Sequence, residues 1–416
     1  MQLRVVTNRV ETSTMAARVS KINDRTTHIA IVGGGLAGGL IALALRWRRP
    51  ELTVTLIEAG DTLGGNHRWS WFDSDLDEAG RALMAPFATN MWYGYDVRFP
   101  AYDRTLKSTY RSLASNEFDA LLRRELGRDT IHTSCAVSSL DRTGVELQDG
   151  TRIDAQTVID CRGPEGSAHL TGGWQVFMGR HLRTDRPHGI ERPCIMDANV
   201  DQHGSCRFVY TLPLAPNEVF IEDTYYDDTP SVDRDAFGAR IDAYCREHGY
   251  AGETIGTETG ILPVITGGDF AAFQRDAAIP GVATAGARGG FVHPLTSYTL
   301  PFAVQTAIAI ADDPDPLDDL AAKLQRRAQD HWRNTAFYRL LGSMMFGAAE
   351  PEERYRVFQH TYRLDDKLIE RFYAGQLTMS DKARLLIGRP PVPITGAMTA
   401  LATKRAPLLA QQEKIG

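Results

Sequence analysis

The segment His28-Ile29-Ala30-Ile31-Val32 runs directly into Gly33-Gly34-Gly35-Leu36-Ala37-Gly38. Its first part is mostly apolar and rich in β-branched residues, which predicts a short buried strand. A helical pattern follows over residues 40–47 and ends in basic side chains, which suit a helix C-terminus. In such a unit Gly33 permits the tight turn, Gly35 lets the backbone approach a pyrophosphate, and Gly38 lets the helix pack closely on the strand. The pattern predicts a dinucleotide-binding α/β fold.

A second predicted strand strengthens this interpretation. It covers residues 52–57 and ends at Glu58, about twenty residues beyond Gly38, where an acid can accept hydrogen bonds from ribose hydroxyls. A glycine triplet alone would also fit a chance turn. The two strands, the helix and the acid together predict a Rossmann-like domain.

Three further segments indicate which dinucleotide is bound. The pair Gly64-Gly65 resembles the continuation of the flavin cradle in the flavoprotein class of glutathione reductase. The small-residue run that ends at Gly286, with the helical pattern over 300–311, resembles the C-terminal flavin segment of that class, with Ala287 in place of its usual Asp. The strand that ends at Asp160 resembles the segment that returns the chain to the cofactor. The resemblance implies that these residues bind FAD.

Composition narrows the classes of function. The 416 residues are enough for two or three lobes, and the net charge of −6 argues against a nucleic-acid partner. The five cysteines are scattered without a C-x-x-C pair, which argues against a disulfide framework and a structural zinc site and fits a reducing cytoplasm. No run reaches the ~18 to 20 apolar residues that would cross a bilayer. We expect a cytoplasmic protein that is soluble or peripheral to a membrane.

Residues 1–27 carry five basic side chains against Glu11 and Asp24 and contain no apolar core of a secretory signal. They are interpreted as a disordered extension, or as the product of a start codon placed too early, with Met15 as the alternative start. A weak basic anchor for an anionic membrane is the other interpretation.

The remaining chain divides into four predicted parts. Residues 28–169 form the first part of the FAD-binding domain and 279–312 its C-terminal part. Between them, 170–278 alternates short β-rich runs with Gly and Pro turns and includes one helical pattern, which is typical of an inserted substrate domain with a mixed sheet. Residues 313–416 are predicted to form a helical C-terminal region, with helical patterns over 317–341 and 352–373. The predicted fold class is therefore α/β, with α+β character in the substrate domain.

The run Phe220-Ile221-Glu222-Asp223-Thr224 places two adjacent acids on an apolar, strand-like segment. In a strand, Phe220, Glu222 and Thr224 share one face, while Ile221 and Asp223 share the other. Only one of the two acids can therefore point directly at a given substrate atom. Burial disfavours a carboxylate and raises its pKa, so such an acid can stay protonated near neutral pH. Two surface acids at a strand end are the alternative interpretation.

Several motifs together resemble the bacterial lycopene β-cyclases of carotenoid synthesis. They are GNHRWSWF (65–72), PHG (187–189), FIEDT (220–224), HPLTSY (293–298), RFYAG (371–375) and GRPP (388–391). The resemblance covers nearly all of residues 28–400 and leaves out the N-terminal extension. Two positions depart from the family pattern: Ser297 replaces a Gly, and Arg180-His181 replaces a glycine-x-glutamate pattern after Gly179.

The resemblance implies a reaction without net redox change, in which the ψ-ends of lycopene are protonated, close through a carbocation and lose a proton to give β-ionone rings. It implies reduced FAD as cofactor, NADPH as electron donor, and lycopene and a monocyclic carotenoid as substrates. By its place in the motif Glu222 is expected to be the acid, with Asp223 as a supporting or second-proton partner. His293 is expected either to orient the isoalloxazine or to satisfy a backbone carbonyl.

Other side chains have two interpretations each. Aromatic faces can stabilise a desolvated cation or simply pack in the core; the candidates are Trp69, Trp71, Phe72, Trp92, Tyr93 and Phe177. Because lycopene is a lipid-soluble substrate, we expect peripheral attachment to the inner face of the cell membrane. The apolar clusters at 344–346 and 371–373 are either the membrane contact or core.

Two other functions share these features. A flavin redox enzyme, such as an isoprenoid reductase, a desaturase or a hydroxylase, would have the same fold. Paired acids in the substrate domain are not needed for that chemistry. A carotenoid carrier without catalysis would leave the acids unexplained.

Overall fold

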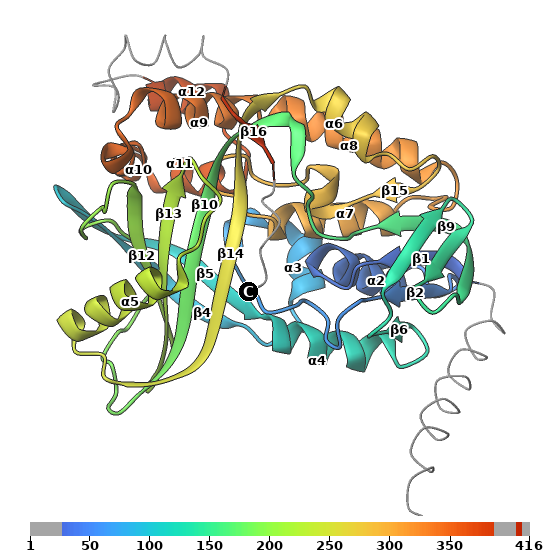
Figure 1. Ribbon diagram of the computed structural model, residues 1–416, viewed down its shortest axis with the longest axis horizontal. Helices are drawn as coiled ribbons and strands as arrows, with labels where there is room; N and C mark the ends of the chain where they lie inside the picture. Colours follow the sequence, from blue (N-terminus) through green and yellow to red (C-terminus); the bar gives the residue numbers. More distant parts are fainter. Residues whose placement is uncertain (1–26, 387–404, 410–416) are drawn as a thin grey trace, which may run out of the picture.

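The computed structural model describes residues 27–386 and 405–409, which form two sheets with helices around them (Figure 1). The predicted extension up to residue 26, with Met15, and the GRPP motif at 388–391 lie outside the described residues.

The first sheet has the predicted Rossmann-like arrangement. Its strands, in order, are β6 (Ile131–His132), β2 (Val54–Ile57), β1 (Thr27–Val32), β9 (Arg152–Asp160), β8 (Gly144–Leu147) and β7 (Val137–Asp141), with β15 (Ala283–Thr284) paired to β9. β1 pairs in parallel with β2 and β9, so Val32 lies beside Ile57 and Asp160. The carboxyl ends of these strands therefore meet at one edge, where folds of this kind bind ligands.

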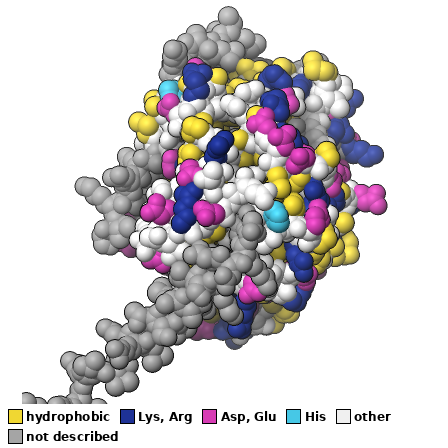
Figure 2. Space-filling view, turned by 90° about the vertical axis from the view of Figure 1, so that its right-hand side faces the viewer, with side chains coloured by type: hydrophobic (Ala, Val, Ile, Leu, Met, Phe, Trp, Pro, Cys, Tyr) yellow, Lys and Arg dark blue, Asp and Glu magenta, His cyan; other side chains and the backbone are white. Residues whose placement is uncertain are grey.

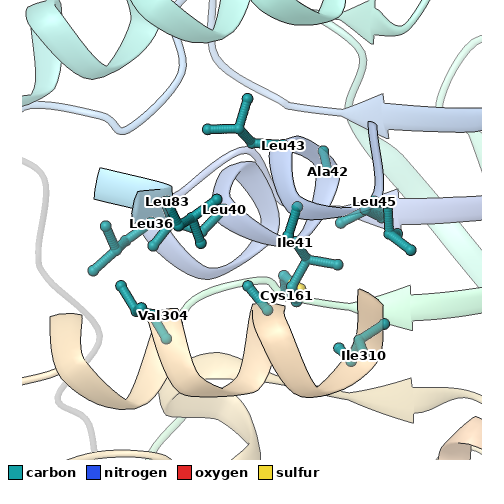
Figure 3. Close-up of a cluster of buried hydrophobic side chains, with 14 of the residues drawn as sticks. Leu36, Leu40, Ile41, Ala42, Leu43, Leu45, Leu83, Cys161, Val304 and Ile310 are labelled. Carbon is teal, nitrogen blue, oxygen red and sulfur yellow. The ribbon is translucent and has the colours of Figure 1, made fainter. Parts of the chain in front are cut away.

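A buried helix pair packs at this sheet. Figure 3 shows Val304 and Ile310 of α7 (Leu300–Ala311) directed toward α2 (Leu36–Arg48). On another side of α2, Gly39 lets α4 (Ser115–Leu126) approach, because a Cβ there would lie 2.5 Å from the side chains of Phe118 and Leu122. Shorter elements complete this half: η1 (Asp73–Asp75), α3 (Glu78–Met84) and η2 (Gly286–Gly289).

The second sheet is larger and mixed, as predicted. Its order is β14 (Gly252–Gly268), β10 (Ser167–Thr184), β13 (Glu218–Asp227), β12 (Cys206–Ala215), β11 (Cys194–Asp197), β4 (Asn90–Phe99), β5 (Tyr102–Ala114) and β3 (Arg68–Phe72), with β16 (Pro407–Leu408) on β10. All neighbours are antiparallel except β11 and β4. The predicted partition does not coincide with the two sheets, because β3, β4 and β5 come from residues 28–169 and complete the sheet of the inserted segment.

The Gly and Pro residues of β14, which the sequence suggested as turns, lie within one long strand. β14 is an edge strand, so Pro263 can occupy it without breaking an internal ladder. Gly260 makes room for the ring of Phe177 on β10, since a Cβ at Gly260 would lie 2.2 Å from that ring.

Helices cover the outer side of the second sheet and one end of the molecule (Figure 1). α5 (Arg234–His248) packs its apolar side chains against β13 and β10, and α6 (Phe270–Ala277) packs on β10. The predicted helical C-terminal region is confirmed over its described residues, as α8 (Leu320–Asn334), α9 (Ala336–Ala348), η3 (Pro351–Glu353), α10 (Tyr355–Tyr362), α11 (Asp366–Tyr373) and α12 (Met379–Leu386). The pattern over 317–341 is divided at Thr335, whose hydroxyl donates to the carbonyl of His331 at 2.7 Å.

The two apolar clusters proposed as membrane contacts are mostly core. Met345, Phe346, Phe372 and Tyr373 are all buried in one aromatic-rich cluster. In the described residues no helix is long and apolar enough to cross a membrane. On the face shown in Figure 2, basic and acidic side chains are interspersed, in line with the small net charge.

The packing of α2 gives a stability test. Leu40 is fully buried between α2 and its neighbours, so Leu40→Ala removes packed methyl groups and leaves a cavity. We expect the free energy of unfolding to fall by about 2 to 5 kcal/mol, measured by urea denaturation. Arg46→Ala, at an exposed position on the same helix, is the matched control and should change it little. Equal effects of the two substitutions would contradict this packing.

Candidate active site

A cavity of about 1080 Å³ extends from the carboxyl ends of β1 and β2 to the inner face of the second sheet. The glycine-rich turn and Glu58 line one part of it, and Glu222 lines another. On β13 the lining follows the period of a strand, with Phe220, Glu222 and Tyr226, and Gln175 and Phe177 of β10 also contribute. The predicted dinucleotide site and the predicted acid Glu222 therefore line a single cavity.

The glycine turn has the predicted close approaches. Gly33 has a left-handed φ of +102°, and a Cβ there would lie 2.7 Å from the carbonyl oxygen of Cys161. A Cβ on Gly38 would lie 2.0 Å from the carbonyl oxygen of Gly33, so the helix can begin against the turn only with glycine at this position. Gly35 differs, because a Cβ there would meet nothing within 4 Å and Gly35 lines the cavity at the N-terminus of α2. The turn thus leaves free the space in which a pyrophosphate is expected.

Glu58 and the second glycine pair continue this cradle. The Glu58 carboxylate accepts hydrogen bonds from the backbone N–H groups of Gly34 and Gly60, each at 2.7 Å, which fixes it beside the turn. Gly64 and Gly65 adopt left-handed φ angles of +81° and +63° and line the cavity.

The C-terminal flavin segment reaches the same place. Gly286 has a φ of +64°, lines the cavity and approaches α2, since a Cβ there would lie 2.8 Å from that of Ala37. The buried oxygens Oε1 of Gln175 and Oγ1 of Thr296 have no hydrogen-bond partner among the described residues, and both side chains line the cavity. These glycines and free polar atoms fit a polar, phosphate-bearing cofactor.

Asp160 does not line the cavity, contrary to its predicted role as a direct cofactor contact. Its buried carboxylate lies 2.8 Å from the guanidinium of Arg162 and 2.8 Å from that of Arg288. Both arginines line the cavity. Asp160 therefore positions two cavity arginines, because the end of β9 turns its side chain toward them.

Glu222 faces the cavity from β13. Its only hydrogen bond within the described residues comes from the hydroxyl of Thr224, at 2.8 Å. The side chain is half-buried by accessible area because it borders the cavity, yet protein surrounds the site. Desolvation, together with the charge of Glu258, raises the pKa of Glu222 to about 8. A carboxyl group in this position can hold a proton at neutral pH.

Asp223 points to the opposite face of the sheet, as the strand period predicts. Its fully buried carboxylate accepts from Arg207 Nε at 2.6 Å and from the Tyr225 hydroxyl at 3.1 Å. Burial raises the pKa of Asp223, and the charge of Arg207 opposes that shift. Asp223 does not line the cavity. The structure therefore does not support the expectation that Asp223 exchanges a proton directly with a substrate there. Its supporting role through β13 stays a prediction.

His293 satisfies backbone groups and does not line the cavity. Nδ1 accepts from the N–H groups of Leu295 and Thr296 at 3.3 and 3.2 Å, so the proton is on Nε2, which donates to the Phe372 carbonyl at 3.1 Å. Burial lowers the pKa of His293 to about 3, and the ring is neutral. Of the two roles predicted for His293, orienting the isoalloxazine or satisfying a backbone carbonyl, the structure shows the second. It ties the HPLTSY loop to α11, and direct catalysis by His293 is not supported.

The same loop explains one departure from the family pattern. Ser297 has a left-handed φ of +58° at the position where the family has Gly, and its hydroxyl donates to the Pro263 carbonyl at 2.9 Å. The turn is kept despite the side chain. The other departure, Arg180-His181, lies within β10 rather than in a loop, where Arg180 pairs with Asp242 and His181 lies 3.1 Å from Glu218.

The aromatic candidates separate by position. Trp69 and Phe177 line the cavity, whereas Trp71, Phe72 and Trp92 are core residues and Tyr93 is 81% exposed. Sequence reasoning missed Arg68, Tyr210 and Glu258, which line the cavity beside Glu222. Arg68 lies in the GNHRWSWF motif, so a signal for it was present in the sequence. Tyr210 on β12 and Glu258 on β14 come beside Glu222 only through strand register.

Comparisons with known proteins identify the relatives of this chain. The family model described as "Lycopene cyclase protein" matches residues 28–399. The lycopene β-cyclase of Pseudescherichia vulneris is 43% identical over 377 residues, which is 89% of this chain and 96% of that protein. That of Paracoccus sp. is 41% identical over 387 residues, covering 92% and 99% of the two chains.

Solved structures share the fold at low sequence identity. A geranylgeranyl bacteriochlorophyll reductase-like protein from Thermoplasma acidophilum has a TM-score of 0.58 at 12% identity, with 91% of this chain and 96% of that one covered. A flavin-dependent halogenase from Xanthomonas campestris has a TM-score of 0.52 at 14% identity, with 93% and 100% covered. These matches bear out the predicted fold class.

The open space at Gly35 separates folding from cofactor binding. Gly35→Val adds a side chain that meets no protein atom at its Cβ but projects into the cavity. We expect the variant to fold with parental stability and to lose FAD, measured by flavin absorbance of purified protein and by titration with added FAD. Gly38→Ala is the contrasting variant, which should lose stability and FAD together because its Cβ collides with the Gly33 carbonyl. A Gly35→Val protein that holds FAD with parental affinity would contradict this cradle.

Proposed function

The chain belongs to the lycopene cyclase family, and from this premise we propose that it cyclises the ψ-ends of lycopene to β-ionone rings by acid/base chemistry. The observation that carries the proposal is Glu222, a carboxyl group with a pKa of about 8 that faces the same cavity as the glycine cradle. Lycopene and the monocyclic carotenoid formed from it are the proposed substrates.

The reaction is an isomerisation, so its atoms balance without an oxidant. One proton adds to the terminal double bond, a carbon–carbon bond closes the six-membered ring, and the resulting carbocation loses one proton to leave a ring double bond. Water in the site would capture the cation, so the cavity must exclude it. The apolar lining from the second sheet, including Phe177, Phe208 and Phe220, supports that requirement.

In this proposal Glu222 delivers the initiating proton. The Thr224 hydroxyl donates to its Oε1 and so fixes the orientation of the carboxyl group. The rings of Phe177, Phe220 and Tyr226 offer faces to the developing cation, each worth ~0.5 to 2 kcal/mol.

The cradle suits FAD, and its glycines and Glu58 are the residues that would hold the cofactor. Gly33, Gly35 and Gly38 would admit the pyrophosphate at the N-terminus of α2, and Glu58 would accept from a ribose hydroxyl. When bound, reduced FAD would supply negative charge near a developing cation. NADPH as the donor that keeps it reduced is part of the proposal.

A flavin redox enzyme is the alternative, and product mass separates the two. Cyclisation leaves the mass of the carotenoid unchanged and consumes no NADPH per turnover, whereas reduction, desaturation or hydroxylation changes the mass. The carboxyl group in the cavity favours cyclisation over desaturation or hydroxylation, which need no proton donor to a substrate carbon, and product mass separates cyclisation from reduction.

Attachment to the membrane is proposed to be peripheral. α12 exposes Met379, which is 79% accessible, and Leu386, beside the exposed Arg384. We expect a high-salt and carbonate wash to release the protein from membranes, and Met379→Glu to lower its recovery with anionic lipid vesicles in a flotation assay. Tyr93→Glu, at an equally exposed apolar position on β4, is the control. Full retention on membranes after the wash would contradict peripheral attachment.

The acid itself gives the decisive test of the proposed function. Glu222→Gln keeps the size and polarity of the side chain but removes the proton donor, so we expect cyclisation to fall by ~10²-fold or more. FAD binding should survive, because Glu222 lies on the second sheet, away from the glycine cradle. Glu218→Gln on the same strand, outside the cavity lining, is the matched control.

In deuterated solvent the parental enzyme should place one deuterium on each new ring and none from labelled NADPH. A Glu222→Gln protein that folds, holds FAD and forms β-carotene at the parental rate would remove this residue from the mechanism.

A further inference from the structure

A second carboxyl group flanks Glu222 across one strand. β10 lies between β13 and β14, and Gly179 of β10 is the register partner of both Glu222 and Glu258. Side chains directly opposite each other in a sheet point to the same face, and both acids line the cavity. Because the residue between them is a glycine, no side chain of β10 separates the two carboxyl groups.

An aromatic ring occupies the space over Gly179. A Cβ on Gly179 would lie 2.3 Å from the ring of Phe220, so that ring covers the glycine and fills the gap between the acids. Charges separated by an apolar ring interact more strongly than charges separated by water. The arrangement therefore couples the two carboxyl groups without a direct hydrogen bond.

The surroundings of the two acids differ. Glu258 Oε1 lies 3.3 Å from the backbone N–H of Arg68 and 3.4 Å from His67 Nδ1, and its charge attracts the guanidinium of Arg68. Within the part of the chain that the structure describes, Glu222 accepts one hydrogen bond, from the Thr224 hydroxyl. These contacts stabilise negative charge on Glu258, whereas Glu222 has no comparable set of donors within the described residues.

We propose that Glu258 is a positioning residue that carries the negative charge of a coupled pair and thereby keeps Glu222 protonated before each cyclisation. The proposal rests on the proposed role of Glu222. A negative charge that faces the same cavity disfavours ionisation of Glu222, so the charge of Glu258 favours the protonated form of Glu222. The charge of Glu258 is the largest contribution from a neighbouring group to the raised pKa of Glu222.

Other titratable groups face this pair. Tyr210 on β12 interacts with Glu222 and bonds to Tyr110, and burial raises the pKa of both phenols, so they stay neutral. His181 on β10 lies beside Glu218, and burial lowers its pKa. Asp223, on the opposite face, adds a smaller repulsion to Glu222. Arg68 on β3 is the nearby cation, and burial lowers its pKa.

The pH dependence of the holoenzyme tests the pair. The protonated form of Glu222 is present below its pKa and lost above it, so cyclisation by the parental enzyme should decline as pH rises through about 8. In Glu258→Gln the repulsion is gone and the pKa falls, so the alkaline limb should move to lower pH by about one unit or more. Glu258→Asp keeps the charge, so its alkaline limb should lie close to the pH at which the parental enzyme loses activity. Glu253→Gln, on the exposed end of the same strand, should leave it unchanged.

Infrared spectroscopy measures the protonation of Glu222 directly. The infrared C=O band of a protonated carboxyl that is absent in Glu222→Gln belongs to Glu222, and its disappearance with pH gives the midpoint without turnover. We expect this midpoint to fall in Glu258→Gln, and also in Glu258→Ser, which serves if the glutamine variant does not fold.

An unchanged midpoint in these charge-removing variants, with Glu222→Gln inactive, would overturn the role of Glu258 and leave the proposed function intact. A fully active Glu222→Gln protein would instead overturn the proposed function, and with it this inference.

Discussion

The cost of keeping a carboxyl group away from water without a cation beside it is the constraint on which this site depends. An isolated buried carboxylate is strongly disfavoured, so the group holds a proton instead. Within the described residues Glu222 has one hydroxyl partner, and burial and the neighbouring charge of Glu258 both favour its protonated form. Asp223, one residue away, has Arg207 at 2.6 Å. Two adjacent acids thus acquire opposite environments because a strand turns alternate side chains to opposite faces.

The architecture divides two tasks between two sheets. The parallel sheet presents backbone at the carboxyl ends of its strands, where glycines allow close approach and a helix N-terminus favours phosphate. The large mixed sheet presents side chains with a period of two, apolar and aromatic around a single carboxyl pair. Helix α5 packs on the outer face of that sheet and buries Ile221 and Tyr225, so the inner face is left for the cavity. Strand β13, which carries the FIEDT motif, therefore contributes side chains both to the core and to the site.

Much of the first sheet could be predicted from sequence, because its signals are local. The turn at Gly33 to Gly38, the acid at Glu58 and the helix over 300–311 lie within short segments whose residue types dictate their conformation. The orientation of Glu222 away from Asp223 followed from strand period alone. Relations between distant strands could not be predicted in this way. Glu258 lies 36 residues from Glu222, and only the register of β13, β10 and β14 brings both beside Gly179. Asp160 and His293 also had roles that depend on partners remote in sequence, namely Arg288 and Phe372.

The low sequence identity of the flavoproteins that share this fold shows how little the fold restricts the chemistry. A dinucleotide cradle needs a few glycines and an acid, and it leaves the facing sheet free to vary. Redox flavoenzymes need groups that position a substrate for electron transfer. An acid/base cyclase needs a dry carboxyl group that recovers its proton after every turnover. In the proposed mechanism of this chain, the acid depends on positions of β10, β13 and β14, and one requirement is an absence, because Gly179 must lack a side chain for the two carboxyl groups to interact across Phe220. The glycine between the acids is therefore as much a part of the site as the acids are.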